Sequence, residues 1–406
     1  MSAVGDPGDR SGNSLAELTR QRFEAIKAGD VGNLPVLLGL ALIVIFFYSK
    51  NSNFLTAGNF TNLITQMAAV TTIAIGVVFV LLLGEIDLSI GYVSGIAGVI
   101  VAQLQVPDGN LVIKGVVAIV IAIIVTSLIG LLHGSFVAII GVPSFVVTLA
   151  GLLFWQGVIL QVIGEAGVIT IEDSTINNIA NYFFTDGVGL LIAAGAAGLF
   201  AVSTLSGVIS RRRHGISSDN LVLVGAKLAG FTAIVFGAVI WANQERGFPF
   251  AGLLVIVLLV FWTWVAERTT FGRHVYAVGG NAEAARRAGI NVRNIRLRVF
   301  MISSAMAGLG GVIFAARLNS VDLGAGGGTV LLDAIAAAVI GGTSLFGGRG
   351  RVISALMGAL IISTVANGID LVGYSSSIKF MVTGAILLAA VTLDAVSRQR
   401  LVRAGR

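Results

Sequence analysis

The chain has 406 residues, of which 56% are hydrophobic and only 11% are charged. Soluble domains carry about 25% charged residues, so this composition excludes an ordinary soluble protein. The absence of cysteine from the sequence excludes disulfides, thiolate metal sites and cysteine nucleophiles, and the three histidines lie far apart. In a soluble chain the net charge of +6 would suggest a nucleic-acid partner. In this chain the useful question is where the charges lie.

A membrane span needs about 20 mainly apolar residues, and most of the chain consists of stretches of about that length. They predict an all-α polytopic membrane protein with about twelve transmembrane helices. The stretches cover 34–49, 62–84, 90–106, 111–132, 144–163, 188–209, 225–242, 250–266, 297–316, 330–346, 352–366 and 376–393. Glycine is frequent within them and allows membrane helices to pack closely.

Charge predicts the orientation of these spans. If the spans alternate from an inner N-terminus, most of the 26 basic residues lie inside. The exceptions are Lys50, Lys114, Arg246, Arg317 and Lys379. Inner loops are enriched in Lys and Arg, so we expect both termini in the cytoplasm and the protein in the cell (inner) membrane. Residues 1–33 are predicted to be a mobile cytoplasmic tail, 34–396 a single transmembrane domain, and 397–406 a basic cytoplasmic tail.

Three interruptions break the apolar pattern, and we call them the first, second and third breaks. They cover 84–91, with Glu85, Asp87 and Ser89; 141–144, where Ser144 follows a proline and is expected to cap a helix; and 341–348, with Thr343 and Ser344. Each is either a tight loop at the membrane surface or a broken, re-entrant segment that lines a pathway. An acid in hydrocarbon costs about 2.5–3.5 kcal/mol, which favours a functional role for the first break.

Other polar positions allow more than one interpretation. Asp333 lies near the start of a span, where it is either a helix N-terminal acid or a pathway residue. Asp370 is expected to be a solvated acid in an outer loop. In the long outer loop over 164–187, the alternation at Thr170 and Ile171 indicates either a short strand or an interfacial segment.

The inner loop over 267–296 contains a short helix, predicted over 281–290. Asn281 is a suitable N-cap, Glu283 an acid of the first turn, and Gly289 a suitable residue to follow the C-terminus. Arg286 and Arg287 fall in the last turn, where the helix dipole favours bases. A helix this short is marginal alone and needs a surface to bind. Composition leaves two such surfaces open, the anionic lipid of the cytoplasmic face and a partner protein.

Four motifs together resemble the permease subunits of bacterial ABC importers for monosaccharides, most of all the xylose branch. They are G-E-I-D-L-S-I-G at 84–91, V-P-S-F-V-V-T-L-A-G at 142–151, V-G-G-N-x-E-A-A-R-x-A-G-I-N-V at 278–292 and L-D-A-I-A-A-A-V-I-G-G-T-S-L-F-G-G at 332–348. The resemblance covers about 34–400. Glu85 departs from the family, in which many members have glycine. The region 165–260 corresponds to an extra helix pair beside a ten-helix core.

The resemblance implies a homodimeric permease in the membrane that works with a cytoplasmic ABC ATPase and an extracytoplasmic sugar-binding protein. It also implies that the 281–290 helix is the coupling helix that contacts the ATPase, through Asn281, Glu283, Ala284, Arg286, Arg287 and Gly289. The sequence has no G-x-x-x-x-G-K-[ST] phosphate loop, so we expect no ATP hydrolysis, no cofactor and no enzymatic activity in this subunit.

An uncharged sugar needs a path with hydroxyl and amide groups within reach. The expected path residues are Gln66, Glu85, Asp87, Ser89, Asp333, Thr343 and Ser344. Two alternatives stay open. One is an ion-coupled secondary transporter that uses the intramembrane acids. The other is an ABC permease for another small polar solute. A membrane enzyme acting on lipid is disfavoured because no clustered catalytic residues are evident.

Overall fold

The computed structural model describes residues 34–106, 112–214 and 220–403. The predicted tail over 1–33 and the last three residues of the chain lie outside this range. The described chain is mainly helical, as predicted. Eight of its helices are long and apolar enough to cross a membrane, and four shorter helices are also apolar. The protein is therefore a polytopic helical membrane protein.

The helices follow one another with short connections. They are α2 (Leu34–Lys50), α3 (Ala57–Leu82), α4 (Ile90–Gln103), α5 (Gly115–Ser135), α6 (Ser144–Ile163), α7 (Ser174–Asn181), α8 (Asp186–Arg213), α9 (Leu221–Ala242), α10 (Phe250–Arg268), α11 (Thr270–Gly280), α12 (Ala282–Arg287), α13 (Val292–Leu318), α14 (Val330–Ile340), α15 (Ile353–Val372) and α16 (Ser376–Arg403). Short helical turns η1 (Ser52–Leu55), η2 (Phe136–Ile140) and η3 (Gly164–Ala166) extend or join them. Each predicted apolar stretch lies largely within one helix.

The chain divides into two compact units. Helices α8 and α9 form a hairpin within residues 184–248, and we call the second unit, Val36–Phe183 with Pro249–Arg406, the main unit. Within the hairpin, the rings of Phe200 and Phe231 stack with centroids 4.1 Å apart. Most of the surface of both helices is exposed, as expected for helices that face lipid.

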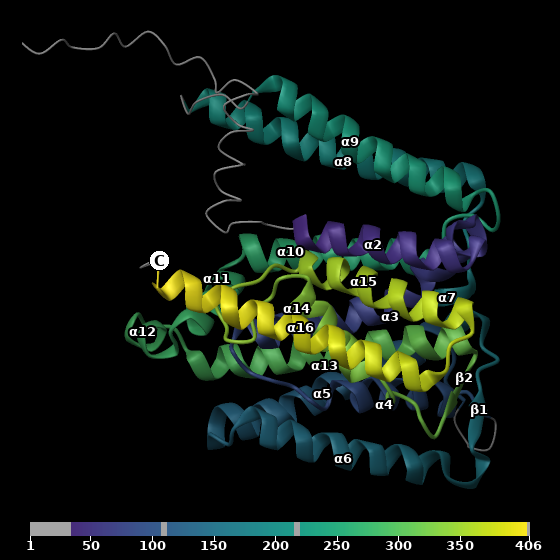
Figure 1. The fold of residues 1–406 in the computed structure, drawn as a ribbon. Helices are drawn as coiled ribbons and strands as arrows, with labels where there is room; N and C mark the ends of the chain where they lie inside the picture. The colour runs from purple at the N-terminus through teal and green to yellow at the C-terminus, as the bar shows by residue number, and fades with distance from the viewer. Residues whose placement is uncertain (1–33, 107–111, 215–219, 404–406) are drawn as a thin grey trace, which may run out of the picture. The chain divides into compact units, whose positions relative to one another are not determined.

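The main unit has two distinct ends (Figure 1). Helices α11 and α12 lie at one end, which we call the α12 end. The other end carries α7 and the antiparallel strands β1 (Val168–Thr170) and β2 (Ser320–Asp322), paired through Ile169 and Val321, and we call it the strand end. The segment around Thr170 is thus a short strand, which settles one of the alternatives left open by the sequence.

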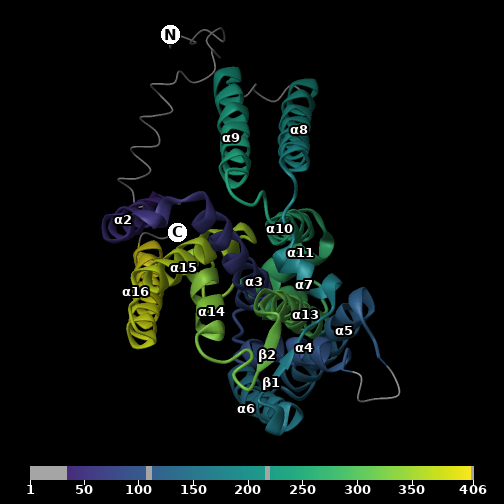
Figure 2. The same cartoon turned by 90° about the vertical axis from the view of Figure 1, so that its right-hand side faces the viewer.

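Two long antiparallel helices, α3 and α13, form the buried centre of the main unit (Figure 2). Glycines permit their close packing. A Cβ atom on Gly76 of α3 would lie 2.8 Å from the carbonyl oxygen of Ser303 on α13. A Cβ on Gly311 of α13 would lie 1.8 Å from the carbonyl oxygen of Ser94 on α4. Any side chain at either position would force backbones apart, so the glycines set the spacing of the core.

The short helices α4 and α14 begin close to each other. A Cβ on Gly91 of α4 would lie 2.7 Å from the carbonyl oxygen of Gly326 and 3.6 Å from the amide nitrogen of Leu331 on α14. With 14 and 11 residues, the two helices are about 21 Å and 17 Å long, too short to cross the hydrocarbon layer of about 30 Å singly. Each follows an irregular segment, the first break before α4 and residues 323–329 before α14.

Candidate functional site

The predicted coupling helix is present as α12, shorter than expected. Asn281 has an extended backbone and caps α12, and its Oδ1 accepts a hydrogen bond from the Ala284 amide at 2.9 Å. The helix ends after Arg287, and Gly289 follows with a φ of +85°. Only six residues are helical because the cap and the left-handed glycine stop the helix at both ends.

The charges of α12 point into solvent. Glu283 pairs with Arg286 at 3.2 Å and with Arg287 at 3.3 Å, and all three side chains are more than half exposed. The helix is anchored by Ala285, which is only 4% exposed. Exposed ion pairs of this kind contribute little to stability. The structure thus presents a capped, charged surface at the α12 end.

Helix α11 precedes α12 and was not predicted. The side chain of Thr269 caps it by accepting a hydrogen bond from the Gly272 amide at 3.2 Å. Val275 and Val278 are buried, and Phe271 stacks against Phe79 of α3 with centroids 6.5 Å apart. The spacing of these apolar residues, i, i+4 and i+7, is typical of one helix face, and this signal was available in the sequence.

The three breaks meet near the α12 end. The amide of Ile86 in the first break donates a hydrogen bond to Ser144 Oγ in the second at 3.2 Å. A Cβ on Gly347 in the third break would lie 2.9 Å from the amide nitrogen of Gly84 in the first. The sequence predicted that Ser144 caps α6, and this prediction is wrong. Ser144 is the first residue of that helix and its hydroxyl holds the first break instead.

The third break is held between α3 and α11. The Gly348 amide donates to the carbonyl oxygen of Leu82, the last residue of α3, at 2.9 Å. The Tyr276 hydroxyl of α11 donates to the carbonyl oxygen of Gly350, two residues after the break, also at 2.9 Å. Burial raises the pKa of Tyr276 and nearby Glu267 adds to the rise, while Arg351 opposes it. The hydroxyl therefore stays protonated and keeps its role as donor.

Contact between α11 and α3 is close because of Gly279. A Cβ there would lie 1.7 Å from the carbonyl oxygen of Leu82 and 2.9 Å from the amide nitrogen of Gly348. The next residue, Gly280, has open space around it, since a Cβ there would meet nothing within 4 Å. The end of α11 thus lies against α3 and the third break, and its tightest approach to both is at Gly279.

Glu85 forms an ion pair across the α12 end. Its Oε1 lies 3.2 Å from Nη2 of Arg296 in the second turn of α13, and the Glu85 side chain is only 15% exposed. The pair joins the first break to the helix that follows α12. Glu85 was predicted as a pathway residue, and the structure gives it a basic partner.

Asp87 and Ser89 belong to a buried chain of hydrogen bonds. Ser89 Oγ donates to Asp87 Oδ1 at 2.6 Å, and Ser303 Oγ of α13 donates to Asp87 Oδ2 at 3.4 Å. His133 Nδ1 of α5 lies 3.2 Å from Ser89 Oγ, and Trp155 Nε1 of α6 donates to His133 Nε2 at 3.2 Å. The first break is thereby tied to three helices.

The donors in this chain fix one arrangement of protons. An indole N–H can only donate, so His133 Nε2 must accept and its Nδ1 carries the hydrogen. His133 therefore donates to Ser89, whose hydroxyl donates in turn to Asp87. In a hydrolase triad the serine gives its proton to histidine, which is the reverse order. This cluster is therefore arranged to hold the break and not to activate a nucleophile.

Sequence reasoning missed His133, Trp155 and Ser303. His133 is only 4% exposed and lies in the last turn of α5. A Cβ on Gly151 of α6 would lie 2.6 Å from His133 Nε2, so this glycine makes room for the ring. The available signal was a polar residue inside an apolar stretch, which in membrane helices marks a structural or functional bond.

The other expected path residues are dispersed. Asp333 lies in the first turn of α14 and accepts a hydrogen bond from Thr329 Oγ1 at 2.6 Å. Thr343 and Ser344 are buried in the third break. Gln66 is half-buried on α3, more than four turns from its end at Leu82. The structure thus gathers Glu85, Asp87 and Ser89 in the first break, and no bond in the described residues joins Gln66 or Asp333 to them.

Asp370 is exposed, as predicted for a solvated acid, but its place in the chain differs from the prediction. It lies in the last turn of α15, not in a loop, and its Oδ2 is 3.3 Å from Lys379 Nζ of α16. Within the described ranges, no group of three or more His, Cys, Asp or Glu side chains could hold a metal ion.

The arrangement defines a class of protein, namely a multi-pass helical membrane protein with interrupted helices and a short, charged, exposed helix at one end. Comparison with known proteins agrees. Residues 59–391 match the family described as branched-chain amino acid transport system / permease component. The chain belongs to this family. It is a permease component of an ABC transport system in the cell membrane, in which a separate subunit carries the ATPase.

Several relatives are similar over nearly their whole length. The xylose transport system permease protein XylH of Escherichia coli K12 is 36% identical over 391 residues, which are 95% of this chain and 97% of XylH. XylH of Haemophilus influenzae is 35% identical over 367 residues, 90% of this chain and 96% of that protein. The ribose import permease protein RbsC of E. coli K12 is 30% identical over 358 residues, 88% and 92%. No solved structure matches the chain.

Proposed function

We propose that this permease imports a monosaccharide, D-xylose, delivered by an extracytoplasmic sugar-binding protein. The observation that carries the proposal is the similarity to xylose permeases over 95% of the chain. Xylose is favoured over ribose because the ribose permease is less similar and matches a smaller part of the chain. The coarser statement, a permease that works with an ATPase and a binding protein, follows from the family itself.

The proposed topology has twelve spans with both termini in the cytoplasm. Ten helices of the main unit form the permease core, and the α8–α9 hairpin is the extra pair. Helices α4 and α14 are the broken spans, each completed by the irregular segment before it, since neither helix is long enough to cross alone and their N-termini meet. Transporters often place their substrate near the membrane midplane, between broken helices of this kind. The basic residues of α12 support a cytoplasmic location for the α12 end.

We further propose that α12 binds the ATPase through Glu283, Arg286 and Arg287, whose exposed side chains suit a docking surface. Movement of α12 would reach the membrane through α11, because Gly279 and Tyr276 touch α3 and the third break. A second copy of the chain would complete the transport path, as the resemblance implies.

We propose two roles for the expected path residues, contact with the sugar for some and positioning of the first break for others. Thr343 Oγ1 is buried and has no hydrogen-bond partner among the described residues, so it could bind a sugar hydroxyl when the third break moves. Glu85, Asp87 and Ser89 are bonded within the arrangement around the first break, so we propose that they hold this break in position, while Gln66, Asp333 and Ser344 contribute polar groups to the path.

Uptake of labelled xylose tests this function. A host without its own xylose transporters would receive the permease together with its ATPase and binding protein, with ribose as the comparison sugar. We expect ATP-dependent xylose uptake, and co-purification of the ATPase that is lost in Glu283→Arg. Uptake that needs no ATPase and collapses with an ionophore would instead support an ion-coupled transporter. ATP-dependent uptake of ribose without uptake of xylose would show that the transported sugar is ribose.

A further inference from the structure

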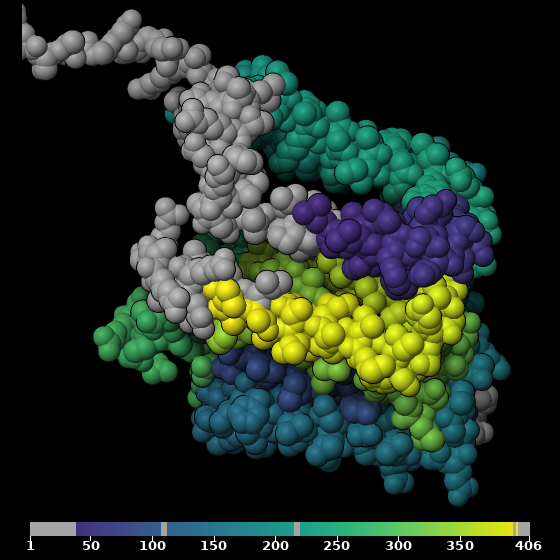
Figure 3. Space-filling view, in the orientation of Figure 1, coloured from purple at the N-terminus to yellow at the C-terminus, as the bar shows by residue number. Residues whose placement is uncertain are grey.

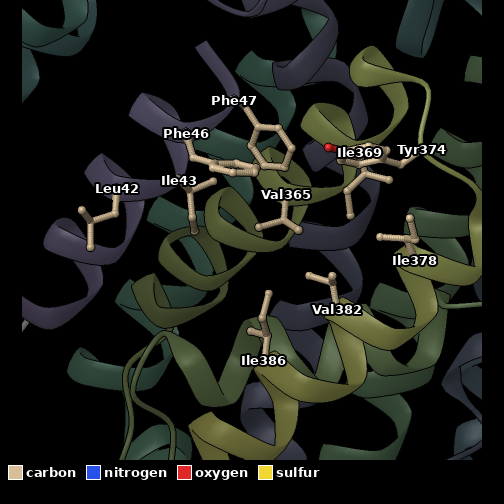
Figure 4. Close-up of a pocket in the computed structure, with 10 residues that line it drawn as sticks. All are labelled: Leu42, Ile43, Phe46, Phe47, Val365, Ile369, Tyr374, Ile378, Val382 and Ile386. Atoms are coloured by element: carbon tan, nitrogen blue, oxygen red, sulfur yellow. The ribbon is translucent and has the colours of Figure 1, made fainter. Parts of the chain in front are cut away.

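An apolar groove runs between α2, α15 and α16 of the main unit (Figure 4). Figure 3 shows α2 and α16 side by side on this face. Its volume is about 530 Å³. Leu42 and Phe46 line it from α2, Val365 and Ile369 from α15, and Ile378 and Val382 from α16. Its floor is buried, since Ile369 is 2% exposed, whereas Leu42 at the rim is 68% exposed. The groove therefore opens sideways, toward the space that lipid occupies in a membrane.

The groove has the length of one lipid leaflet. It begins where α2 ends at Lys50 and α16 begins at Ser376, and its last lining residue on α16 is Ile386. Figure 4 shows Ile378, Val382 and Ile386 in a row along α16. Ten residues of helix rise about 15 Å, which is half of the hydrocarbon thickness of about 30 Å. The groove thus starts at the strand end of the main unit and is about as long as one lipid leaflet is thick.

An acyl chain suits this groove. The lining is apolar apart from the hydroxyl of Tyr374, so it offers almost no hydrogen-bonding partner. Lipid tails are as apolar as leucine side chains, and a thin, flexible acyl chain can follow a groove between three helices.

A positive charge stands at the open end of the groove. Lys50 is exposed, and its Nζ lies 6.0 Å from the ring centroid of Phe46, which lines the groove. Among the residues that the structure describes, Lys50 forms no ion pair, whereas Lys379 of α16 is neutralised by Asp370. A lysine beside the headgroup layer attracts the phosphate of an anionic lipid.

We propose that this groove binds one acyl chain of an anionic phospholipid, with the lipid phosphate at Lys50. The lipid would fill the space between α2, α15 and α16 and hold α2 against the main unit. The apolar lining selects a chain but not a headgroup, and Lys50 supplies the preference for negative charge. The proposal does not depend on the identity of the transported sugar.

Native mass spectrometry of the full-length permease tests the proposal. The protein would be purified in mild detergent and exposed to phosphatidylglycerol or phosphatidylcholine with identical acyl chains. We expect one retained phosphatidylglycerol per chain, and retention about fivefold weaker in Lys50→Gln, the loss of one lysine–lipid attraction. Lys114→Gln removes another exposed lysine outside the groove and should retain the lipid as the unchanged protein does.

A groove-filling variant separates lipid from other occupants. Val382→Phe adds bulk from the half-exposed face of α16 and should abolish retention of both lipids, with folding checked by thermal unfolding. The proposal would be overturned if the unchanged protein retained phosphatidylglycerol and phosphatidylcholine equally and Lys50→Gln retained both lipids to the same extent as the unchanged protein. So would full retention in Val382→Phe, or a loss of dimer mass in that variant without any bound lipid, which would assign the groove to a second copy.

Discussion

The contact between α11 and α3 leads to a sharp prediction about Gly279. In Gly279→Ala the new Cβ would lie 1.7 Å from the carbonyl oxygen of Leu82, where an ordinary contact needs at least 3.4 Å. The end of α11 must therefore move by about 1.7 Å to restore an ordinary contact, because the obstacle is backbone and cannot rotate away. Overpacking of this kind costs about 1–3 kcal/mol.

That strain acts on the conformation in which α11 touches α3 and the third break. An energy of about 1–3 kcal/mol shifts an equilibrium between two conformations by about 5–150-fold. We therefore expect Gly279→Ala to lower sugar uptake per ATP hydrolysed by at least fivefold, while the ATPase stays bound through α12. Gly280→Ala is the matched control. Its Cβ meets nothing, and alanine is the better helix former, so transport should be unchanged.

The assay is the purified complex in proteoliposomes, with uptake and ATP hydrolysis measured on the same preparation and bound ATPase measured by co-purification. If Gly279→Ala transports as well as Gly280→Ala does, then this contact does not transmit movement. If the ATPase no longer co-purifies with Gly279→Ala, the substitution has disturbed ATPase binding. The proposal that α12 binds the ATPase while α11 transmits movement would then be wrong.

Three further predictions concern the first break. Reversing the charge of Glu85 or of Arg296 alone should lower uptake, and reversing both charges together should restore part of it. In a double-mutant cycle of thermal unfolding, we expect a coupling energy between the two residues of about 0.5–3 kcal/mol. Additivity of the two changes would show that the pair is not coupled. Gly151→Ala should displace the ring of His133 and destabilise the protein by about 1–3 kcal/mol, observed as a lower unfolding temperature and altered tryptophan fluorescence. Asp87→Asn exchanges one acceptor oxygen for an N–H donor, and we expect a loss of about 1–3 kcal/mol and reduced uptake with the ATPase still bound. Unchanged uptake and stability would rule out a positioning role for this carboxylate.

The helices could be predicted from the sequence because each membrane helix corresponds to a run of consecutive apolar residues, which is a local signal. It also located α12, since a cap, an acid, two bases and a glycine occur at neighbouring positions. It missed α11, whose apolar face recurs only at Phe271, Val275 and Val278 within a polar loop.

The polar contacts were harder to predict because they join residues far apart in the chain. Ser89 and His133 are separated by 44 positions, and Asp87 and Ser303 by 216. Nothing local to Asp87 indicates which distant hydroxyl it will meet. The helix packing decides this, and that packing depends on glycines such as Gly151, whose role appears only in three dimensions.

The hairpin of α8 and α9 begins and ends at one narrow point of the chain. The amide of Phe184 donates to the carbonyl oxygen of Phe248 at 2.9 Å, and Phe183 and Pro249 form a bridge beside them. Sixty-odd residues therefore leave and return between adjacent positions, as in an inserted module. Such a segment can be gained, lost or exchanged during evolution without repositioning the rest of the chain, because its two attachment points already lie next to each other. A permease with a short turn between Phe183 and Pro249 would keep every helix of the main unit, which makes this position a natural place to graft a reporter domain.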